Sequence, residues 1–379
     1  MPAVSSSRIP YLDSLRGLAA LMVICSHLNL SYFHFGEEAP WLHRSVLHIF
    51  YDGEAAVVFF FVLSGFVLSA PYVQEDSRRW DTFRYLPYLV KRVFRIFPLL
   101  WVVIVLTFLV SQAIHWDVAN IPERTWGKWW WHDRFHPWEW LRQGSLLYMR
   151  PDDTNYVPQS WSLTIEVVMS AFLPLMILMI RRNLSWLLLF AVLMMWVFQV
   201  YAYIFHFVLG IILAKYRLPL MRFYQQRTKW LLWITLLLGL VFYTYRYSIA
   251  AWFPVWSVLQ YLLFSETSIL LITGLGTAAL LVFAMQSPRF QQVMQWPFLR
   301  LAGRVSYSLY LGHLLVLVLL TPLFVYFLNR QGLVAPFPVL LLATVFTLSA
   351  SLALAVMLYY VVERPFMQWG KRIASRFEP

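Results

Sequence analysis

The chain has 379 residues, of which 60% are hydrophobic and 13% charged, and its formal net charge is +12. A mean hydropathy of +0.62 excludes a soluble globular protein, and many apolar runs are long enough to cross a bilayer. A single cysteine, Cys25, excludes internal disulfide bonds and cysteine-based metal clusters.

The apolar runs predict an all-α polytopic membrane protein with about ten transmembrane helices in one bundle around a central cavity. We place these helices at residues 11–30, 54–72, 93–114, 161–180, 184–199, 201–214, 230–247, 265–286, 303–328 and 337–361. An interfacial helix at 251–264 is expected before the eighth of them. An even number of spans places both termini on one side of the membrane.

The positive charge follows the loops, so it indicates membrane topology and not nucleic-acid binding. If both termini are cytoplasmic, all but eight of the 30 Lys and Arg residues lie on the cytoplasmic side, as the positive-inside rule requires. The eight others are Arg44, Arg124, Lys128, Arg134, Arg142, Arg150, Arg246 and Arg330.

The one long external loop, residues 115–160, is rich in tryptophan. Its seven tryptophans are Trp116, Trp126, Trp129, Trp130, Trp131, Trp138 and Trp140. They can form an interfacial belt, since tryptophan prefers the headgroup zone. They can also form a platform on which sugar rings stack, with the loop carboxylates accepting hydrogen bonds from hydroxyl groups.

The first predicted helix carries ionisable residues in an apolar context, which usually marks a functional site in a membrane. Arg16 and His27 are eleven residues apart and therefore share one face of a helix. Asp13 and Arg16 are three residues apart, so they can form an ion pair. This helix is expected to present a cation near one membrane surface and an imidazole deeper in the bundle.

Six further patterns occur in a fixed order along the chain. They are LDSLRGLAALMVICSH in the first helix, VVFFFVLSGFVLS in the second, KRVFRIFP at the start of the third, QSWSLTIE in the fourth, GRVSYSLYLGH in the ninth and VERP after the last. As an ordered set they resemble the membrane-bound acyltransferase-3 family, the integral-membrane O-acyltransferases that modify bacterial surface glycans. The resemblance runs from residue 11 to about 366 and implies one acyltransferase domain over 1–379. One departure is that Glu166 precedes Val167, Val168 and Met169, where family members commonly have aromatic residues.

The resemblance implies an enzyme of the bacterial cytoplasmic (inner) membrane that transfers an acyl group, usually acetyl, from cytoplasmic acyl-CoA to a carbohydrate hydroxyl. It implies that Arg16 and His27 form the signature pair, with His27 catalytic, and that Arg92 and Arg95 serve the CoA side. The acceptor stays open among lipopolysaccharide O-antigen, exopolysaccharide, periplasmic glucan, peptidoglycan and a glycosylated metabolite. We expect no fused extracellular domain, so the membrane domain and the 115–160 loop would bind the acceptor.

His27 is suited to act as the general base that removes the hydroxyl proton, because the ordinary pKa of imidazole is close to working pH. The alternative is a histidine that only packs in the core. Cys25 lies about 200° around the helix from His27, so these two cannot form a dyad on that helix. Arg16 is expected to hold a phosphate or the thioester carbonyl, while Asp13 pairs with it.

Arg92 and Arg95 lie on one face of the third helix, where two guanidinium groups can grip the phosphates of CoA. The alternative for both is ordinary anchoring at the cytoplasmic surface. Glu166 and Ser162, four residues apart in the fourth helix, are expected to form a polar pair. Glu166 then either orients the His27 ring or tethers helices.

In the ninth helix, Ser306, Tyr310 and His313 share one face, whereas Tyr307 points elsewhere. This face is expected to line the site and to donate hydrogen bonds to the thioester oxygen, or else only to connect helices. Glu363 is expected to be a structural clamp. The sequence shows no set of His, Asp and Glu at metal-ligand spacing, so we predict no metal.

The main alternative function is a membrane transporter that exports a glycolipid or a sugar. Such a protein would also have polar residues that face a cavity. Against it, the two halves of the chain contain no matching pair of helices broken by Gly or Pro, which is the usual mark of an inverted repeat.

Overall fold

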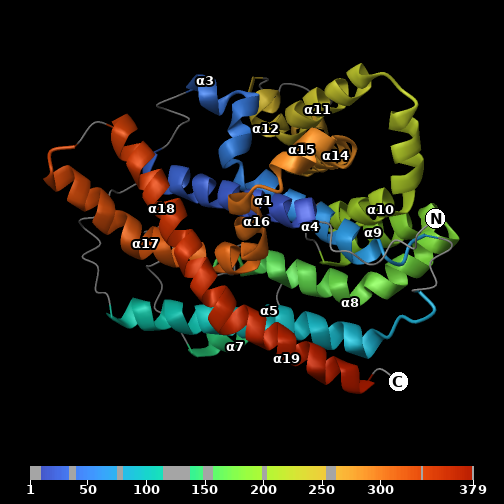
Figure 1. Ribbon diagram of the computed structural model, residues 1–379, viewed down its shortest axis with the longest axis horizontal. Coiled ribbons are helices and arrows are strands. Elements are labelled where there is room, and N and C mark those ends of the chain that lie inside the picture. Colours follow the sequence, from blue (N-terminus) through green and yellow to red (C-terminus); the bar gives the residue numbers. More distant parts are fainter. Residues whose placement is uncertain are drawn as a thin grey trace. The chain divides into compact units, whose positions relative to one another are not determined.

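The computed structural model describes residues 10–33, 40–74, 80–113, 137–147, 157–198, 203–252, 262–333 and 336–377. Every regular element in these ranges is helical (Figure 1). The predictions for residues 114–136 and 148–156, which include five of the seven loop tryptophans (all but Trp138 and Trp140), lie outside the described residues.

Seven described helices are long and apolar enough to cross a membrane, so the chain is a multi-pass membrane protein. They are Pro10–Tyr32, Tyr85–Val110, Ser160–Arg182, Tyr203–Gln225, Glu266–Gln286, Ser306–Arg330 and Phe337–Phe377. An eighth span results if the helices Lys229–Tyr243 and Tyr245–Trp252, which are bent by 81°, count as one. The remaining apolar helices, Gly53–Ser69 and Leu184–Val197, are shorter, so the predicted count of about ten is not confirmed.

The described helices fall into two compact units. The first unit comprises residues 1–19, 39–83 and 168–304, and the second comprises 20–38, 84–167 and 305–379. The division falls within two continuous helices, α1 (Pro10–Leu28) and α8 (Ser160–Arg182).

The first unit contains most of the central part of the chain. Its other elements are α3 (Pro40–His43), η2 (Val46–Tyr51), α4 (Gly53–Ser69), α9 (Leu184–Phe198), α10 (Tyr203–Gln225), α11 (Lys229–Tyr243), α12 (Tyr245–Ser248), η5 (Ala250–Trp252), α14 (Glu266–Gln286), α15 (Pro288–Val293) and α16 (Pro297–Arg304). The closest approach is between α4 and α10. A Cβ atom added at Gly65 would overlap the carbonyl oxygen of Phe207, and one added at Gly210 would overlap that of Val62. The two backbones therefore touch where neither helix has a side chain.

The second unit contains the C-terminal helices. Its other elements are η1 (Asn29–Phe33), α5 (Tyr85–Ala113), α7 (Pro137–Ser145), α17 (Ser306–Arg330), α18 (Pro336–Leu358), η6 (Tyr359–Glu363), α19 (Arg364–Ala374) and η7 (Ser375–Phe377). In Figure 1, α5 runs beside α19, and α17 packs on α18. Buried residues such as Leu99, Val103, Leu311 and Val362 connect α5, α17 and η6 in one apolar core.

Several predicted boundaries differ from the observed ones. The third predicted helix begins at Tyr85 and not at 93, because the segment before the apolar run, which includes the basic residues Lys91 and Arg92, is also helical. The predicted loop at 287–304 contains α15 and α16, and the predicted loop at 115–160 contains α7. Of the interfacial helix expected at 251–264, residues 253–261 lie outside the described ranges.

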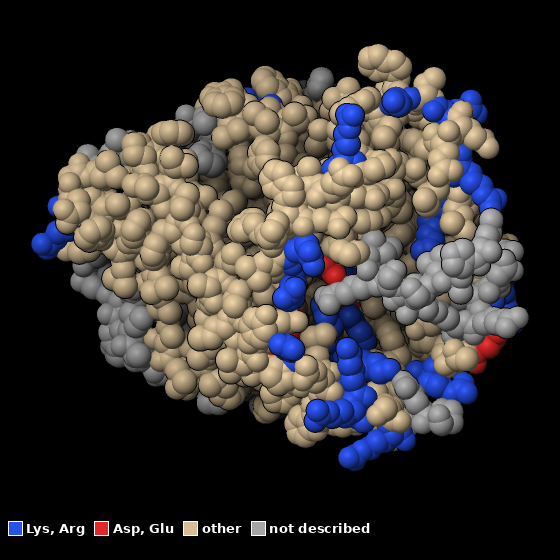
Figure 2. All heavy atoms as spheres, viewed as in Figure 1, with Lys and Arg blue, Asp and Glu red and all other residues tan. Residues whose placement is uncertain are grey.

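The surface agrees with a membrane environment. Figure 2 shows mostly uncharged side chains on the face that it draws, and the Lys and Arg spheres visible near the C-terminal end of α19 are much more numerous than Asp and Glu spheres. Large apolar side chains such as Trp196, Val361 and Phe337 are exposed, as expected of helices that face lipid.

Candidate functional site

Two histidines from distant parts of the chain meet in the second unit. Nε2 of His313, on α17, lies 3.2 Å from Nδ1 of His27, near the end of α1. Their ring centroids are 5.2 Å apart. His313 is fully buried, whereas His27 is partly exposed. The sequence predicted both residues as members of the site, but not their contact.

The hydrogen bonds assign the tautomers of the two rings. Nδ1 of His313 lies 2.7 Å from the carbonyl oxygen of Tyr310. A carbonyl oxygen can only accept, so this nitrogen carries the proton and Nε2 of neutral His313 is an acceptor. Nδ1 of His27 must then be the donor in the contact between the histidines. This leaves Nε2 of His27 with a lone pair, which is the state that a general base needs.

The end of α1 is held in place by packing against α17. Leu28, next to His27, belongs to an apolar cluster with Leu314 and Leu317. The helix then continues as the π-helical turn η1, where the hydroxyl of Tyr32 donates a hydrogen bond of 3.2 Å to the carbonyl oxygen of Leu317. Single π-helical turns are frequent at functional sites. These contacts fix His27 against the face of α17 that carries His313.

A polar cluster surrounds Tyr310, one turn before His313. Its hydroxyl lies 2.9 Å from the hydroxyl of Ser162 on α8. The Gln159 side chain donates to the carbonyl oxygens of Leu311, at 2.9 Å, and Tyr310, at 3.4 Å. Ser162 therefore bonds to Tyr310, and to the backbone of Gln159 at 2.9 Å. The expected pair of Ser162 and Glu166 is not formed, because Tyr310 provides the partner from a neighbouring helix.

Gln159 is the residue of this cluster that the sequence analysis did not select. It opens the QSWSLTIE pattern, and its side chain is 5% exposed. A buried amide within an ordered pattern is a signal for a partner, because unpaired polar groups are costly in a membrane. Its partner is the same Tyr310 carbonyl that accepts from His313, so Gln159 helps to fix the backbone beneath the histidine pair.

Glu166 forms an ion pair with Arg92 of α5. Nη2 of Arg92 donates to Oε1 of Glu166 at 2.6 Å, and the two side chains are 12% and 24% exposed. Arg95, one turn later, contacts the sulfur of Met367 at 3.7 Å. The two predicted CoA-binding arginines thus differ in environment: the charge of Arg92 is already matched by a carboxylate, whereas Arg95 contacts a thioether.

The other polar residues of α17 connect helices of the second unit. Ser306 is buried at the start of the helix. Tyr307, which was expected to point away from the His313 face, donates a hydrogen bond of 2.6 Å to the carbonyl oxygen of Ile96 on α5. Ser308 donates one of 2.7 Å to Oε2 of Glu363, which is buried. The last contact agrees with the clamp expected of Glu363.

Arg16 and Asp13 lie in the first unit. Nη1 of Arg16 donates to Oδ1 of Asp13 at 3.4 Å, which confirms the expected pair. Close by, Gly17 contacts the backbone of Gly303 on α16 so tightly that a Cβ atom would not fit. Arg16 and His27 lie on one uninterrupted helix, α1, as predicted.

The described residues contain no group of three or more His, Cys, Asp or Glu side chains arranged to hold a metal ion. His132 and His136 lie outside the described ranges. The described polar side chains of the second unit carry imidazole, hydroxyl, amide, carboxylate and guanidinium groups.

Comparison with known proteins gives the family. The family model of the acyltransferase-3 proteins, described as an acyltransferase domain, matches residues 9–356. The chain is also similar to the acyltransferase MdmB of Streptomyces mycarofaciens, with 29% identity over 182 residues, which cover 46% of this chain and 41% of that protein. The match thus spans less than half the length of that relative. No solved structure matches the chain significantly. Because the family match covers most of the sequence, this protein belongs to the acyltransferase-3 family.

Proposed function

We propose that this protein transfers an acyl group, most simply acetyl, from acyl-CoA to a hydroxyl group of a carbohydrate, with His27 as the general base. The family supports acyl transfer by a membrane enzyme. The observation that carries the assignment of the base is the contact between His27 and His313, which directs the lone pair of His27 to Nε2.

The reaction needs two proton transfers, one from the acceptor hydroxyl to His27 and one from His27 to the leaving sulfur. The acceptor hydroxyl oxygen attacks the thioester carbonyl carbon while Nε2 of His27 removes the hydroxyl proton. As the carbon–sulfur bond breaks, the ester forms and the thiolate of CoA leaves. The proton on His27 then passes to that sulfur, which restores the neutral imidazole. No other co-reactant is required.

In this mechanism, His313 stabilises His27 while His27 holds the proton. When His27 is protonated, its Nδ1–H remains directed at Nε2 of His313, a neutral acceptor that spreads the charge into a buried hydrogen-bond chain. This is the role that a carboxylate has in catalytic triads. Because its own Nδ1–H is bonded to Tyr310, neutral His313 has no donor for the thioester oxygen. Ser162 donates its proton to the Gln159 carbonyl oxygen, so the Tyr310 hydroxyl is the donor in its contact with Ser162. We assign oxyanion stabilisation to Tyr310, whose hydroxyl would exchange this bond for one to the thioester oxygen, with Ser162 positioning it.

The donor side is assigned to Arg92, Arg95 and Arg16. A guanidinium binds phosphate bidentately, and CoA carries several phosphates. The ion pair with Glu166 orients the Arg92 guanidinium on the helix that also carries Arg95. Replacing Arg95 by Gln should raise the concentration of acyl-CoA that gives half-maximal rate and leave the acceptor dependence unchanged. An unchanged donor dependence would reduce this arginine to a membrane anchor.

The acceptor is assigned to the carbohydrates of the bacterial envelope or their lipid-linked precursors, at the cytoplasmic membrane. The support is the ordered set of sequence patterns and the multi-pass helical fold. Both termini are proposed to be cytoplasmic, because that orientation places most Lys and Arg residues inside.

The test is transfer of label from acetyl-CoA to glycan by the purified full-length protein in nanodiscs. The wild type should acetylate a carbohydrate, and His27→Ala should abolish transfer while the protein still inserts and elutes as a folded species. His206→Ala is the matched control, because it removes a buried imidazole that is bonded to the backbone of Leu270 in the first unit. Normal transfer by His27→Ala would remove the base assignment. Sugar movement across vesicles without any acyl transfer would favour the exporter.

A further inference from the structure

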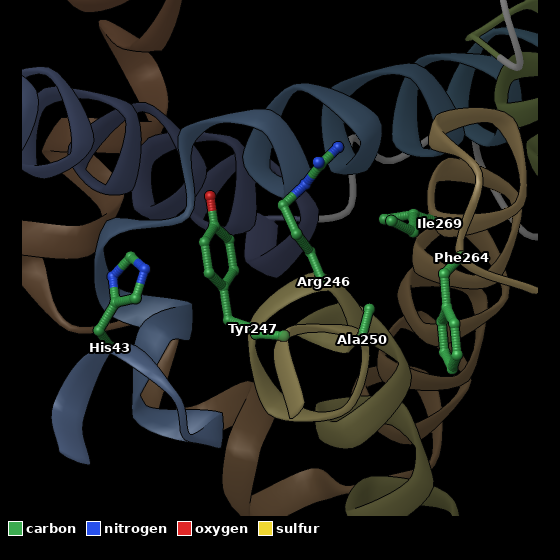
Figure 3. Close-up of a pocket in the computed structure, with 7 residues that line it drawn as sticks. His43, Arg246, Tyr247, Ala250, Phe264 and Ile269 are labelled. Atoms are coloured by element: carbon green, nitrogen blue, oxygen red, sulfur yellow. The ribbon is translucent and has the colours of Figure 1, made fainter. Parts of the chain in front are cut away.

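A cavity of about 300 Å³ lies in the first unit, and neither His27 nor His313 lines it. It is lined by His43, Arg246, Tyr247, Ala250, Ala251, Phe264 and Ile269. In Figure 3, His43 and Tyr247 lie on one side, Phe264 and Ile269 on the other, and Arg246 extends between them toward the neighbouring helix. A volume of about 300 Å³ is at the lower end of the range for small-molecule sites.

The cavity lies where a membrane helix is broken. The chain bends by 81° between α11 and α12, and α12 and η5 provide Arg246, Tyr247 and both alanines. Irregular backbone within a membrane protein is tolerated where it is buried in protein or lines an aqueous cavity. In transporters, broken helices of this kind form binding sites. The break therefore places polar groups beside a space that a ligand can enter.

The charge of Arg246 is already balanced. Its guanidinium bonds to both carboxylate oxygens of Glu266, at 2.8 and 2.5 Å, and to Glu54 at 2.8 Å. These bonds use three of the five N–H groups, so the remaining two are available to a hydrogen-bond acceptor in the cavity. With two carboxylates beside it, this arginine favours a neutral oxygen over a phosphate.

The histidines beside the cavity are also uncharged. His48 is buried against Tyr247, with ring centroids 3.4 Å apart, and its Nδ1 bonds to the carbonyl oxygen of His43. Burial lowers the pKa of His48 to about 3. Burial, and then the charge of Arg44, lower the pKa of His43. Nδ1 of His43 is buried and has no hydrogen-bond partner among the described residues, so it offers one polar atom to a ligand.

We propose that this cavity binds an uncharged sugar ring and serves as a subsite for the carbohydrate acceptor. The binding of the sugar follows from the cavity, whereas its role as acceptor rests on the proposed function. The C–H faces of a pyranose fit between the rings of Tyr247 and Phe264, beside Ile269. Its hydroxyl oxygens accept from Arg246, and one hydroxyl pairs with His43.

The lining discriminates among ligand classes. An anionic ligand such as CoA meets the two carboxylates that already pair with Arg246, and gains little. An acyl chain would leave the buried nitrogen of His43 and the two N–H groups of Arg246 without partners, which is costly. An uncharged ring with several hydroxyl groups satisfies both the polar and the apolar parts. The positive-inside pattern also predicts that Arg44 and Arg246 lie on the external side, where a surface glycan would arrive.

The test measures binding without chemistry, in the absence of acyl-CoA. Saturation-transfer NMR on the full-length protein in nanodiscs is run with methyl glucoside, methyl rhamnoside, N-acetylglucosamine and, as the anionic comparison, glucose 6-phosphate. Ala250→Phe fills the cavity, and Ala353→Phe adds the same ring at an exposed position of α18. We expect at least one neutral sugar to bind the wild type and Ala353→Phe. Ala250→Phe should bind it at least about tenfold more weakly, and glucose 6-phosphate should bind no better than the neutral sugars.

The proposal would be overturned if no neutral sugar binds, or if Ala250→Phe binds sugar as well as Ala353→Phe does. Stronger binding of glucose 6-phosphate would also overturn it, because the cavity would then be an anion site. A second measurement separates this proposal from the proposed function. If Ala250→Phe raises the acceptor concentration needed for acyl transfer, the cavity is an acceptor subsite. If sugar binds there but the wild type acylates no carbohydrate, the acyl-transfer proposal fails and the binding site stands.

Discussion

In the proposed mechanism, His27 acts as the base and His313 positions it. The hydrogen bonds that connect these residues run in one direction, from Nδ1 of His27 to Nε2 of His313 and from Nδ1 of His313 to the Tyr310 carbonyl oxygen. A backbone carbonyl cannot reverse its role, so the chain of donors is fixed from that end. The direction of the chain, and not the mere proximity of two imidazoles, keeps Nε2 of His27 unprotonated.

A pair of substitutions at His313 tests this direction. His313→Phe keeps a ring but removes the acceptor, so kcat should fall by about 10²-fold while the KM values for donor and acceptor change little. His313→Gln can still accept the proton of His27 through its amide oxygen and should recover part of kcat. Steady-state kinetics with both substrates gives the result. Equal losses in the two variants, or a loss confined to KM, would show that His313 only fills space.

Asp52, the N-cap of α4, provides a prediction on pH. Its Oδ1 accepts from the backbone N–H of Ala55 at 2.9 Å, and the side chain is 5% exposed. Burial raises the pKa of Asp52 from 3.8 to about 7. The folded state therefore holds the proton at a pH where the unfolded state has lost it, so this group lowers stability as pH rises from about 4 to about 7, at roughly 1.4 kcal/mol per unit of pKa shift.

Asp52→Asn removes this dependence, because asparagine also caps helices and does not ionise. Thermal unfolding in detergent across this pH range should show a smaller loss of stability than in the wild type, and the variant should be more stable at pH 8. Asp81→Asn, which changes an exposed carboxyl, is the control. If Asp52→Asn and the wild type lost stability in parallel, the carboxyl would be ionised in the folded protein throughout.

The sequence indicated which residues make polar contacts better than it indicated which residues they contact. The spacing of Asp13 and Arg16 within one helix predicted their ion pair, because local geometry alone decides it. Contacts between helices could not be predicted in this way. Glu166 bonds to Arg92, 74 positions away, and Ser162 bonds to Tyr310, because the packing of α8 against its neighbours selects the partner. Helical spacing shows which residues share one face of a helix, but not which residues of a neighbouring helix pack against that face.

At the scale of elements, the presence of a helix could be predicted from the sequence, whereas the residues at which it ends could not. The apolar pattern gave α1, α4, α5, α8 and α17 because each run is long. The ends follow other rules. Proline does not end α10, which continues through Pro219 to Gln225. The charged segment before the apolar run of α5 is also helical, so α5 begins at Tyr85. Polar residues continue a helix outside the lipid without any change in hydrogen bonding, so hydropathy marks the membrane and not the helix.

Glycines decide how closely α4 and α10 approach, and this can be tested. Gly65→Ala and Gly210→Ala each place a methyl group against a backbone carbonyl that belongs to a helix and cannot move aside at low cost. Overpacking of this kind costs about 1–3 kcal/mol. Both variants should unfold at a lower temperature than the wild type. Gly144→Ala is the matched control, since its added atom would meet only the Trp101 ring at 3.4 Å, an ordinary contact. Equal stability of all three variants would mean that α4 and α10 are not closely packed.

At the scale of the whole molecule, the distribution of positive charge predicts the orientation in the membrane, and the hydropathy predicts the class of protein. The composition was sufficient to predict a multi-pass helical membrane protein, because no soluble fold exposes so many apolar side chains. The number of spans was less accessible, since Gly53–Ser69 and Leu184–Val197 are shorter than a typical span and α11 with α12 is bent. Short and broken helices occur where a membrane protein forms a binding site. The length of a helix in such a region does not show whether it crosses the membrane.

The orientation can be tested with two single cysteines in a Cys25→Ser background, both in the second unit. Ser375→Cys places a thiol in the C-terminal segment, which the positive-inside pattern puts in the cytoplasm, and Gln331→Cys places one after α17, at the end that the same pattern puts outside. Both original residues are exposed, so each thiol is open to reagent. A membrane-impermeant maleimide should label Gln331→Cys in intact spheroplasts and Ser375→Cys only after lysis. The reverse pattern would invert the topology, and labelling of both in intact spheroplasts would place the two helix ends on one side. Since the proposed donor, acyl-CoA, would be cytoplasmic, the outcome also tests whether Arg92 and Arg95 face the compartment that would hold it.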